Sequence, residues 1–337
     1  MKNIRIILLI LTGILVGICA RAQDPSFSQF FSSPLNINPS LTGNINNEWR
    51  AISNFRDQWA GPAYPYITGT ISFDTRMLKD KIPENHSLGI GGMLMFDKTM
   101  GGVLKSNYAS INSAYNIQIG ESDRGGVHRL GLGIGGIYGN RRVDYSRLVF
   151  GEQFNGTGFD ANLPTGETAL SQMKPYWSVS SGLLYSYSSD FTNVDVGFAG
   201  FHLNKPKQSF LEDPKQILPV RWVGHANFEH FINEMVVVNA NAIYQRQSTT
   251  SYFSVGAALG YYLSEEDNIL VNGGLWYWSN NAVVPYFGFV YKKFQVGLSY
   301  DITVSKLSSG ARRPNSFEMS LILRGDRNKV YVPCPWK

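Results

Sequence analysis

Long runs of alternating apolar and polar residues are the feature that most constrains the fold of this chain. Over residues 294–305, every second position is apolar or aromatic, and the positions between carry Gln, Gly, Ser, Asp or Thr. Successive side chains of a β-strand point to opposite faces, so this pattern predicts a strand with one apolar and one polar face. Residues 253–263 repeat the pattern. The apolar positions of the first run are Phe294, Val296, Leu298, Tyr300, Ile302 and Val304.

The length of these runs indicates a membrane protein. Strands of about 9–11 tilted residues cross a bilayer, whereas strands of soluble proteins average about 5–6. Aromatic residues lie near the ends of the apolar faces, as with Phe253 and Tyr261, where a lipid-facing band meets the interfaces. Backbone groups in lipid must all be paired, so such strands have to close on themselves. We therefore expect an all-β transmembrane outer-membrane barrel with a polar interior.

The alternation predicts about fourteen antiparallel strands, an even number as in bacterial barrels. With the N-terminus in the periplasm, the long connections 141–175 and 203–218 face outside, and short connections such as 188–190 are periplasmic turns. Loop 141–175 is expected to extend from the surface of the barrel, and the alternative is that it folds back into the lumen. The expected strands are 48–57, 67–76, 86–97, 103–119, 128–140, 176–187, 191–202, 219–231, 234–246, 249–263, 267–279, 282–292, 293–304 and 315–324.

Residues 1–22 have the form of a secretory signal peptide. A basic start precedes an apolar stretch, 6–18, that is too short to span a bilayer, and an A-x-A site ends at Ala22, before Gln23. A lipoprotein signal at Cys19 is the alternative. The rest of the chain has no apolar run of about 18 residues, so no transmembrane helix is predicted. Export and two-faced strands together predict a multi-pass protein of the Gram-negative outer membrane.

The composition excludes some function classes. Charged residues make up 16% of the chain, against about 25% in soluble domains. The formal charge of +5 includes Lys2, Arg5 and Arg21 of the signal peptide, so the mature chain is close to neutral. We therefore expect no nucleic-acid partner. Removal of Cys19 leaves Cys334 without an intramolecular partner, which excludes a disulfide framework.

The mature chain is expected to form one barrel, residues 48–325, between an N-terminal segment, 23–47, and a periplasmic tail, 326–337. Prolines prevent a long helix in segment 23–47, while its apolar side chains need burial. We expect this segment to plug or cap the periplasmic mouth of the barrel, and the alternative is a loop packed on a partner protein. The residues expected to form the plug are Phe27, Phe30, Phe31, Pro34, Asn38 and Pro39.

Several motifs resemble the PorP/SprF family. Residues 24–43 (DPSFSQFFSSPLNINPSLTG) are similar to the opening of that family. Five further stretches follow in the family's order over nearly the whole mature chain: 55–59 (FRDQW), 200–206 (GFHLNKP), 299–301 (SYD), 317–321 (FEMSL) and 334–336 (CPW). The ending differs slightly, because Trp336-Lys337 stands where the family often has a basic residue and Phe.

This resemblance implies a non-enzymatic outer-membrane barrel of the type IX secretion and gliding machinery, without a cofactor. Family members are associated with anchoring exported surface adhesins, through the cargo's C-terminal secretion domain, and with periplasmic ring and peptidoglycan-associated components. The lipid bilayer is the other expected partner. For residues 56–59 the alternative is a place in the belt of aromatic side chains at the membrane–water interface, with Trp59 at the level of the lipid headgroups. The positions expected to bind partners are Arg56, Asp57, Gln58, Trp59, His202, Asn204, Lys205 and Pro206.

The remaining motifs do not predict catalysis or metal binding. Residues 131–136 match GxGxxG, but they lie within an alternating strand, so we expect small lumen-facing residues and no nucleotide site. The five histidines lack metal-site spacing, and Gly-x-Ser-x-Gly is absent. A solute channel is the alternative function, and an outer-membrane hydrolase is a third. Lumenal ion pairs are expected between carboxylates (Asp195, Glu229, Asp301, Glu318) and arginines (Arg50, Arg56, Arg129, Arg221, Arg324).

Overall fold

The computed structural model describes residues 24–61, 64–78, 81–122, 125–166, 172–211, 213, 215–264, 268–279, 281–305 and 314–326. The expected signal peptide, Cys334 and all of the expected tail except Asp326 lie outside these residues.

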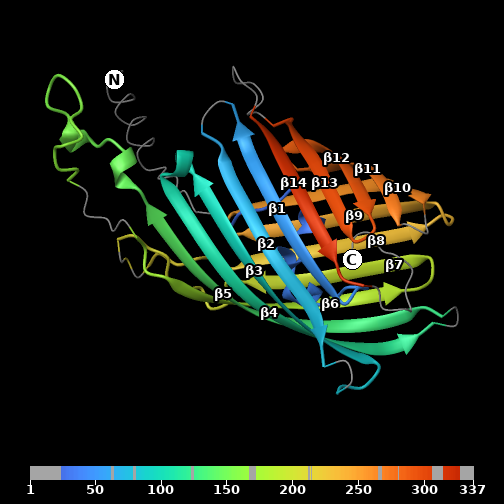
Figure 1. Cartoon of the computed structure of the whole chain (residues 1–337). Helices are drawn as coiled ribbons and strands as arrows, with labels where there is room; N and C mark the ends of the chain where they lie inside the picture. Colours follow the sequence, from blue (N-terminus) through green and yellow to red (C-terminus); the bar gives the residue numbers. More distant parts are fainter. Residues whose placement is uncertain are drawn as a thin grey trace, which may run out of the picture.

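In this described part, fourteen antiparallel strands form one closed barrel (Figure 1). Each strand pairs with its sequence neighbours, and β1 closes the barrel by pairing with β14. The predicted fold class and strand number are confirmed. The strands are β1 (Trp49–Ala60), β2 (Tyr66–Met77), β3 (His86–Thr99), β4 (Leu104–Glu121), β5 (Val127–Val143), β6 (Tyr176–Ser188), β7 (Thr192–Phe201), β8 (Arg221–Phe231), β9 (Val236–Gln247), β10 (Thr250–Ser264), β11 (Ile269–Trp278), β12 (Ala282–Tyr291), β13 (Phe294–Thr303) and β14 (Asn315–Arg324).

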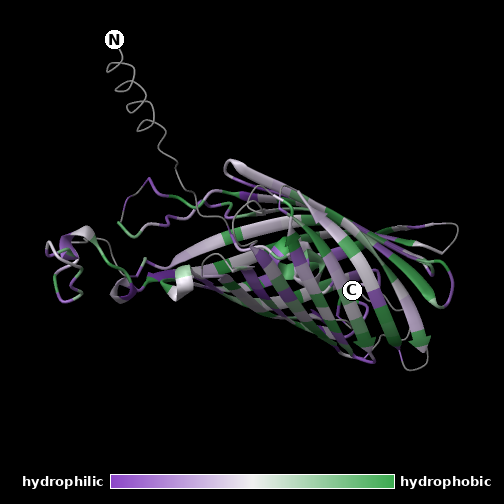
Figure 2. Cartoon of the chain, turned by 90° about the horizontal axis from the view of Figure 1, so that it is seen from above, coloured by the Kyte–Doolittle hydropathy of each residue, from purple (hydrophilic) through white to green (hydrophobic). Residues whose placement is uncertain are grey.

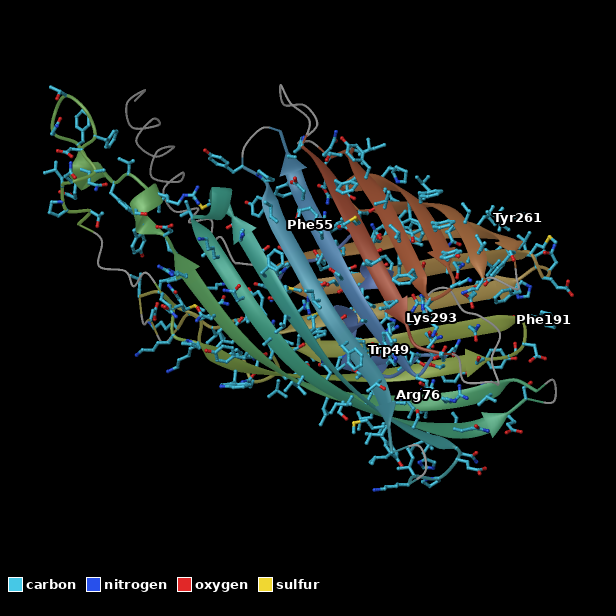
Figure 3. All side chains as sticks on the ribbon, in the orientation of Figure 1. Trp49, Phe55, Arg76, Phe191, Tyr261 and Lys293 are labelled. Atoms are coloured by element: carbon cyan, nitrogen blue, oxygen red, sulfur yellow. The ribbon has the colours of Figure 1, made fainter. Side chains whose placement is uncertain are left out.

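The two faces of the wall have the predicted chemistry. On β13, Phe294 and Tyr300 are 52% and 45% exposed, whereas Gln295 and Asp301 are 0% and 1% exposed. Hydrophobic and hydrophilic blocks alternate along the strands in Figure 2. Because an exposed apolar band of this kind is stable against acyl chains, the outer surface is the lipid-facing one. Phe55 and Tyr261 are on this outer face in Figure 3.

The barrel has two different ends. At the end where β1 begins, called here the turn end, the chain passes from β12 to β13 through Lys292 and Lys293 alone. At the opposite end, the loop end, residues 144–175 and 202–220 form the long connections. The first of these, green in Figure 1, extends away from the barrel and contains η4 (Tyr145–Arg147) and η5 (Gly151–Gln153). A third short helix, η3 (Met100–Gly102), joins β3 to β4.

Strand β1 is longer than the sequence indicated, because it extends to Ala60 instead of ending near residue 57. A register shift against β14 falls between Asp57 and Ala60. Trp59, inside this irregular stretch, has a left-handed backbone with φ 61°. A bulge of this kind lets pairing continue after the regular alternation has stopped, so the alternation by itself placed the end of the strand too early.

The N-terminal segment lies inside the barrel, where it appears as the dark blue helices behind the wall in Figure 1. It contains only single turns of helix: η1 (Phe30–Ser32), α2 (Pro34–Ile37) and η2 (Pro39–Leu41). Pro34 and Pro39 occupy the first position of α2 and η2, where a missing N–H costs nothing. Asn38 caps η2 by accepting a hydrogen bond from Ser40 N at 2.8 Å. Residues 24–47 are called the lumen segment below.

Candidate functional site

The lumen segment runs the full length of the barrel interior. Its first described residue, Asp24, lies at the loop end, where its backbone N donates to Gln247 Oε1 at 2.9 Å. Its last residue, Asn47, lies at the turn end and donates to the carbonyl oxygen of Gly325 at 3.0 Å. The segment expected at the periplasmic mouth therefore extends through the lumen to the opposite end. The interior of the barrel is thus the candidate functional site.

At the loop end, the carboxylate of Asp24 is bound by two wall residues. His202 Nε2 lies 2.7 Å and Arg221 Nε 3.2 Å from Asp24 Oδ2. The other ring nitrogen of His202 is 2.7 Å from Ser178 Oγ, which fixes the ring, and Arg221 stacks on Phe201 at 4.2 Å. Burial alone would raise the pKa of Asp24, but His202 and Arg221 together hold it well below its ordinary value. His202 and Arg221 therefore form a preformed binding site for one carboxylate.

A second polar cluster joins the segment to the strands that close the barrel. Arg56 of β1 pairs with Asp301 of β13 at 2.9 Å and with Glu318 of β14 at 2.6 Å, and all three side chains are at most 2% exposed. Glu318 accepts hydrogen bonds from the backbone N of Ser28 at 2.6 Å and of Gln29 at 2.8 Å. Buried charges are tolerated only when they are paired and hydrogen-bonded. The lumen segment supplies part of that pairing.

The middle of the segment is held by aromatic contacts. Phe31 lies between Trp276 of β11 and Tyr286 of β12, with ring centroids 4.9 Å and 5.4 Å away. Phe30 is buried in the same hydrophobic cluster, together with Val284 and other lumen-facing side chains of β6 to β12. Aromatic pairs in such geometry add to the stabilisation from burial. The apolar part of the lumen therefore extends to β12, next to the polar cluster of β13, β14 and β1.

Glycines of the wall let the backbone of residues 38–43 approach closely. A Cβ at Gly133 would overlap the backbone of Pro39 and Ser40, one at Gly182 would overlap the side chain of Asn38, and one at Gly89 would overlap the carbonyl of Thr42. Gly133 belongs to the GxGxxG match, and it faces the lumen. These glycines are called the glycine track: Gly89, Gly133 and Gly182.

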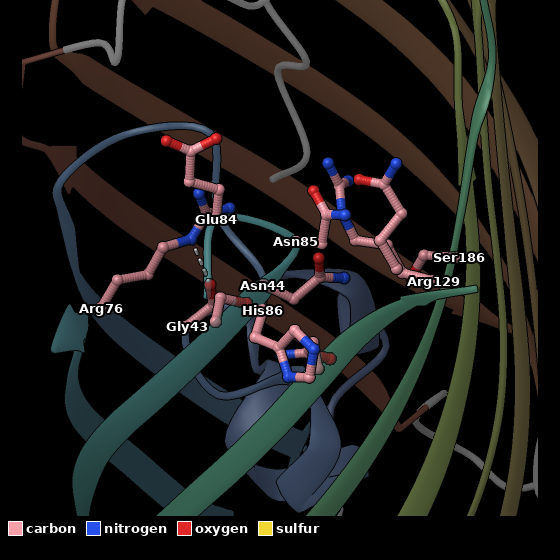
Figure 4. A pocket seen from close by; sticks show the side chains of 11 residues that line it. Gly43, Asn44, Arg76, Glu84, Asn85, His86, Arg129 and Ser186 are labelled. Atoms are coloured by element: carbon pink, nitrogen blue, oxygen red, sulfur yellow. Dashed lines mark hydrogen bonds between the residues drawn. The ribbon is translucent and has the colours of Figure 1, made fainter. Parts of the chain in front are cut away.

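At the turn end, the segment leaves the lumen beside a polar cavity of about 100 Å³ (Figure 4). Asp74 accepts from Gly43 N at 2.9 Å and pairs with Arg50 at 2.9 Å. Arg76 donates from Nε to the carbonyl of Gly43 at 3.0 Å, and its Nη2 binds the carbonyl of Ile45. The cavity lies beside these contacts and is lined by Gly43, Asn44, Arg76, Glu84, Asn85, His86, Ser87, Asn116, Gln118, Arg129 and Ser186.

The predicted partner-binding motif at residues 56–59 is divided between the lumen and the loop end of β1. Arg56 is 0% exposed inside the lumen, whereas Asp57, Gln58 and Trp59 are half-buried near the loop end. Trp59 packs edge-on against Tyr66 at 5.5 Å. Its backbone N donates to Ser316 Oγ at 3.2 Å. The structure therefore joins Arg56 to the lumen segment and leaves its three sequence neighbours half-buried at the end of β1.

The second motif is divided in the same way. His202 is buried against Asp24. Asn204 fixes the start of the loop to β6, accepting from Val179 N at 3.1 Å and donating to the carbonyl of Trp177 at 2.9 Å. Lys205 is exposed and Pro206 is buried. Of the four residues, Lys205 alone presents its side chain freely at the loop end.

The residues expected to form a plug all lie in the lumen segment, and all but the half-buried Phe31 are buried. Sequence reasoning did not identify Asp24 as a contact residue, because its partners His202 and Arg221 are remote in sequence. It grouped Arg56 with Asp301 and Glu318 as lumenal ion pairs, and two such pairs are present. Of the other residues in that set, Asp195 and Glu229 accept hydrogen bonds from Ser186 Oγ and Asn193 Nδ2, and Arg324 donates to Gln295.

The described residues contain neither a metal-binding cluster nor a membrane-spanning helix. No group of three or more His, Cys, Asp or Glu side chains is arranged to hold a metal ion within those residues. Among the helices of the same part of the chain, none is long and apolar enough to cross a membrane.

Known proteins place this chain in a family. Solved barrels that it resembles include the Pseudomonas putida toluene transporter TodX (10% identity, TM-score 0.47, covering 86% of this chain and 93% of that one). A Pseudomonas aeruginosa FadL homologue (11%, 0.43, 85% and 92%) and the KdgM porin (8%, 0.37, 81% and 98%) are also similar. No curated protein matches the sequence. The family model described as type IX secretion system membrane protein PorP/SprF matches residues 20–323. The chain therefore belongs to the PorP/SprF family of type IX secretion system membrane proteins.

Proposed function

We propose that this chain is a non-enzymatic outer-membrane barrel of the type IX secretion and gliding machinery that anchors an exported surface adhesin. The family match supports a role in this machinery. The observation that carries the anchoring role is the lumen segment, whose contacts run from Asp24 at the loop end to Asn47 at the turn end. A barrel filled along its length is suited to holding a partner and poorly suited to passing solutes.

The two ends of the barrel have different partners in this proposal. The loop end faces the cell exterior and receives the adhesin or its C-terminal secretion domain. Its loops carry exposed aromatic side chains, such as the Phe154 and Phe159 pair with ring centroids 5.2 Å apart. The turn end faces the periplasm and contacts the ring and peptidoglycan-associated components. Signal-peptide cleavage near Ala22-Gln23 precedes insertion.

Deletion of the gene tests the anchoring role. We expect the amount of one surface adhesin at the cell surface to fall while general type IX secretion continues, as measured by surface labelling and proteomics of the secreted fraction. Loss of all type IX secretion would instead indicate a core component of the machine. Unchanged adhesin would contradict the proposal.

Conductance in planar bilayers tests the rival solute channel. We expect the purified protein to show almost no ion conductance, because the lumen segment fills the interior. Stable, large conductance together with impaired nutrient uptake in the deletion strain would favour a channel for small solutes and contradict an anchoring function.

A further inference from the structure

The wall of the lumen binds the lumen segment largely through its main chain. Side chains of six wall residues contact backbone groups that every polypeptide has. Two of them accept hydrogen bonds from backbone N–H groups: Glu318 from Ser28 and Gln29, and Asp74 from Gly43. Four donate to backbone carbonyl oxygens: Arg56 to Ser26 at 3.0 Å, Asn54 to Ser32 at 3.0 Å, Arg221 to Asn36 at 3.1 Å, and Arg76 to Gly43. These contacts do not depend on the side chains of the segment. The same wall can therefore bind another extended polypeptide.

The lumen segment has no core of its own. Its helices are three, four and three residues long, far too short to be stable in isolation. Phe27, Leu35 and Phe30 pack against wall residues such as Met93, Met95 and Trp276. A segment that is ordered only by the wall can be replaced by a different segment that makes equivalent contacts, because replacement breaks no internal fold.

We propose that the lumen is a polypeptide-binding channel, that residues 24–47 are its intramolecular occupant, and that an extended segment of the exported surface protein takes their place. The inference rests on the proposed function for the source of that partner. The partner segment carries a carboxylate and an aromatic side chain at the spacing of Asp24 and Phe31.

Two side-chain sites give the channel its selectivity. The carboxylate site, formed by His202 and Arg221, takes an acidic side chain or a chain-terminal carboxylate. The aromatic site, between Trp276 and Tyr286, takes a ring. Beyond them the glycine track lets the chain lie directly on the wall, with backbone against Gly89 and Gly133 and the Asn38 side chain against Gly182. The partner is therefore an unfolded stretch of chain, since a folded domain could not approach the glycines.

The position of Asp24 sets the direction of exchange. Asp24 lies at the loop end, whereas Asn47 continues directly into β1 at the turn end. After the proposed signal-peptide cleavage, the segment can detach only from its Asp24 end, and a partner arriving at the loop end meets the carboxylate site first. Replacement then proceeds contact by contact toward the turn end, without requiring the whole segment to leave at once.

Peptide binding to the full-length protein tests the channel directly. The probe is a synthetic peptide of residues 24–43 with a fluorophore at its Gly43 end, measured by fluorescence anisotropy in detergent micelles. We compare the wild type with the double variant Asp24→Asn and Phe31→Ala, which weakens the resident segment and leaves the wall intact. We expect the double variant to bind the peptide at least about tenfold more tightly than the wild type. A peptide carrying the same two substitutions should bind about tenfold more weakly than the original peptide.

A wall substitution controls for binding elsewhere on the barrel. Adding His202→Gln to the double variant should weaken peptide binding, because the peptide still carries the Asp24 carboxylate that His202 contacts and the resident segment no longer does. Adding Met319→Leu, on the outer face of β14, should not weaken peptide binding. Circular dichroism and the heat-dependent shift on electrophoresis check that each barrel is folded, and the single variant Asp24→Asn replaces the double variant if the latter is not. Equal binding by wild type and double variant, or peptide binding that is unaffected by His202→Gln, would overturn the proposal.

The same measurements separate the two proposals. If the peptide binds in the lumen but the deletion strain keeps its adhesin, the channel exists and the proposed anchoring function is wrong. If the deletion strain loses the adhesin but the peptide does not bind, the anchoring function stands and the lumen is not the site.

Discussion

Glu318 Oε1 lies 2.6 Å from Arg56 Nη1 and also 2.6 Å from the backbone N of Ser28, so one carboxylate connects the last strand, the first strand and the lumen segment. Both Glu318 and Arg56 are at most 1% exposed. An ion pair at this depth is strongly destabilising to break, because each partner would be left as an uncompensated buried charge.

Replacing Glu318 by Gln tests this connection. The amide keeps the shape of the side chain but loses the charge that pairs with Arg56, while Asp301 remains as a partner of Arg56. We expect the attachment of the lumen segment to weaken by about 2–3 kcal/mol, measured as faster hydrogen exchange at Ser28 and Gln29. Met319→Leu is the matched control on the outer face. Unchanged exchange at both amides would show that Glu318 does not hold the segment.

The glycine track gives a test from the wall side. Gly133→Ala places a Cβ against the backbone of Ser40. We therefore expect the lumen segment to move away from the wall at this point, with a loss of about 1–3 kcal/mol of stability. The displaced segment should be more sensitive to protease. Gly136→Ala, three positions further along the same strand, has no atom within 4 Å of the new Cβ and serves as the control. Equal protease resistance of the two variants would mean that the close approach at Gly133 does not matter.

Phe31 tests the aromatic site. Phe31→Ala removes a ring that packs between Trp276 and Tyr286. Because Phe31 is half-buried, we expect a loss of about 2 kcal/mol, below the 3–5 kcal/mol of a fully buried Phe, measured as a lower thermal midpoint in detergent. Phe154→Ala, in the exposed hairpin of the loop between β5 and β6, should leave the midpoint unchanged. A midpoint that falls equally in both variants would contradict a specific role for Phe31.

The attachment of Asp24 should depend on pH. Its pKa is held below the ordinary value because burial is outweighed by His202 and Arg221. A depressed pKa means that the stabilisation is present above the ordinary pKa, about 3.9, and is lost as the pH falls toward the lower value. The difference in hydrogen exchange of the lumen segment between wild type and Asp24→Asn should therefore be present at about pH 5 and shrink below about pH 4. A difference that disappears near neutral pH would contradict this assignment.

The barrel could be predicted from the sequence because the bilayer imposes a simple rule on each strand. Phe294 and Gln295 must face opposite ways whatever the rest of the chain does, and the same rule separates strands from turns along the whole wall. The end of β1 was missed because the bulge near Trp59 breaks that alternation without ending the pairing.

The path of the lumen segment could not be predicted in the same way. Its prolines exclude a long helix but do not indicate which wall residues it meets. The contact of Asp24 with His202 and Arg221 depends on which strands surround the lumen, and only the closed barrel fixes that. For Arg56 the sequence supported both a partner-binding motif with Trp59 and a lumenal ion pair, and the closed barrel selects the ion pair.

The joining of β1 to β14 has a consequence for assembly. These strands are the most distant pair in sequence, so their union carries the largest entropic cost of any pairing in the wall and is expected to form late. Asp301, Glu318 and Arg56 line the inside of that seam, and Ser28 contacts all three. The lumen segment can thus act as an internal template for the pairing of β1 with β14. Substitutions at its contacts with these strands would then slow insertion of the barrel even where the finished barrel is stable.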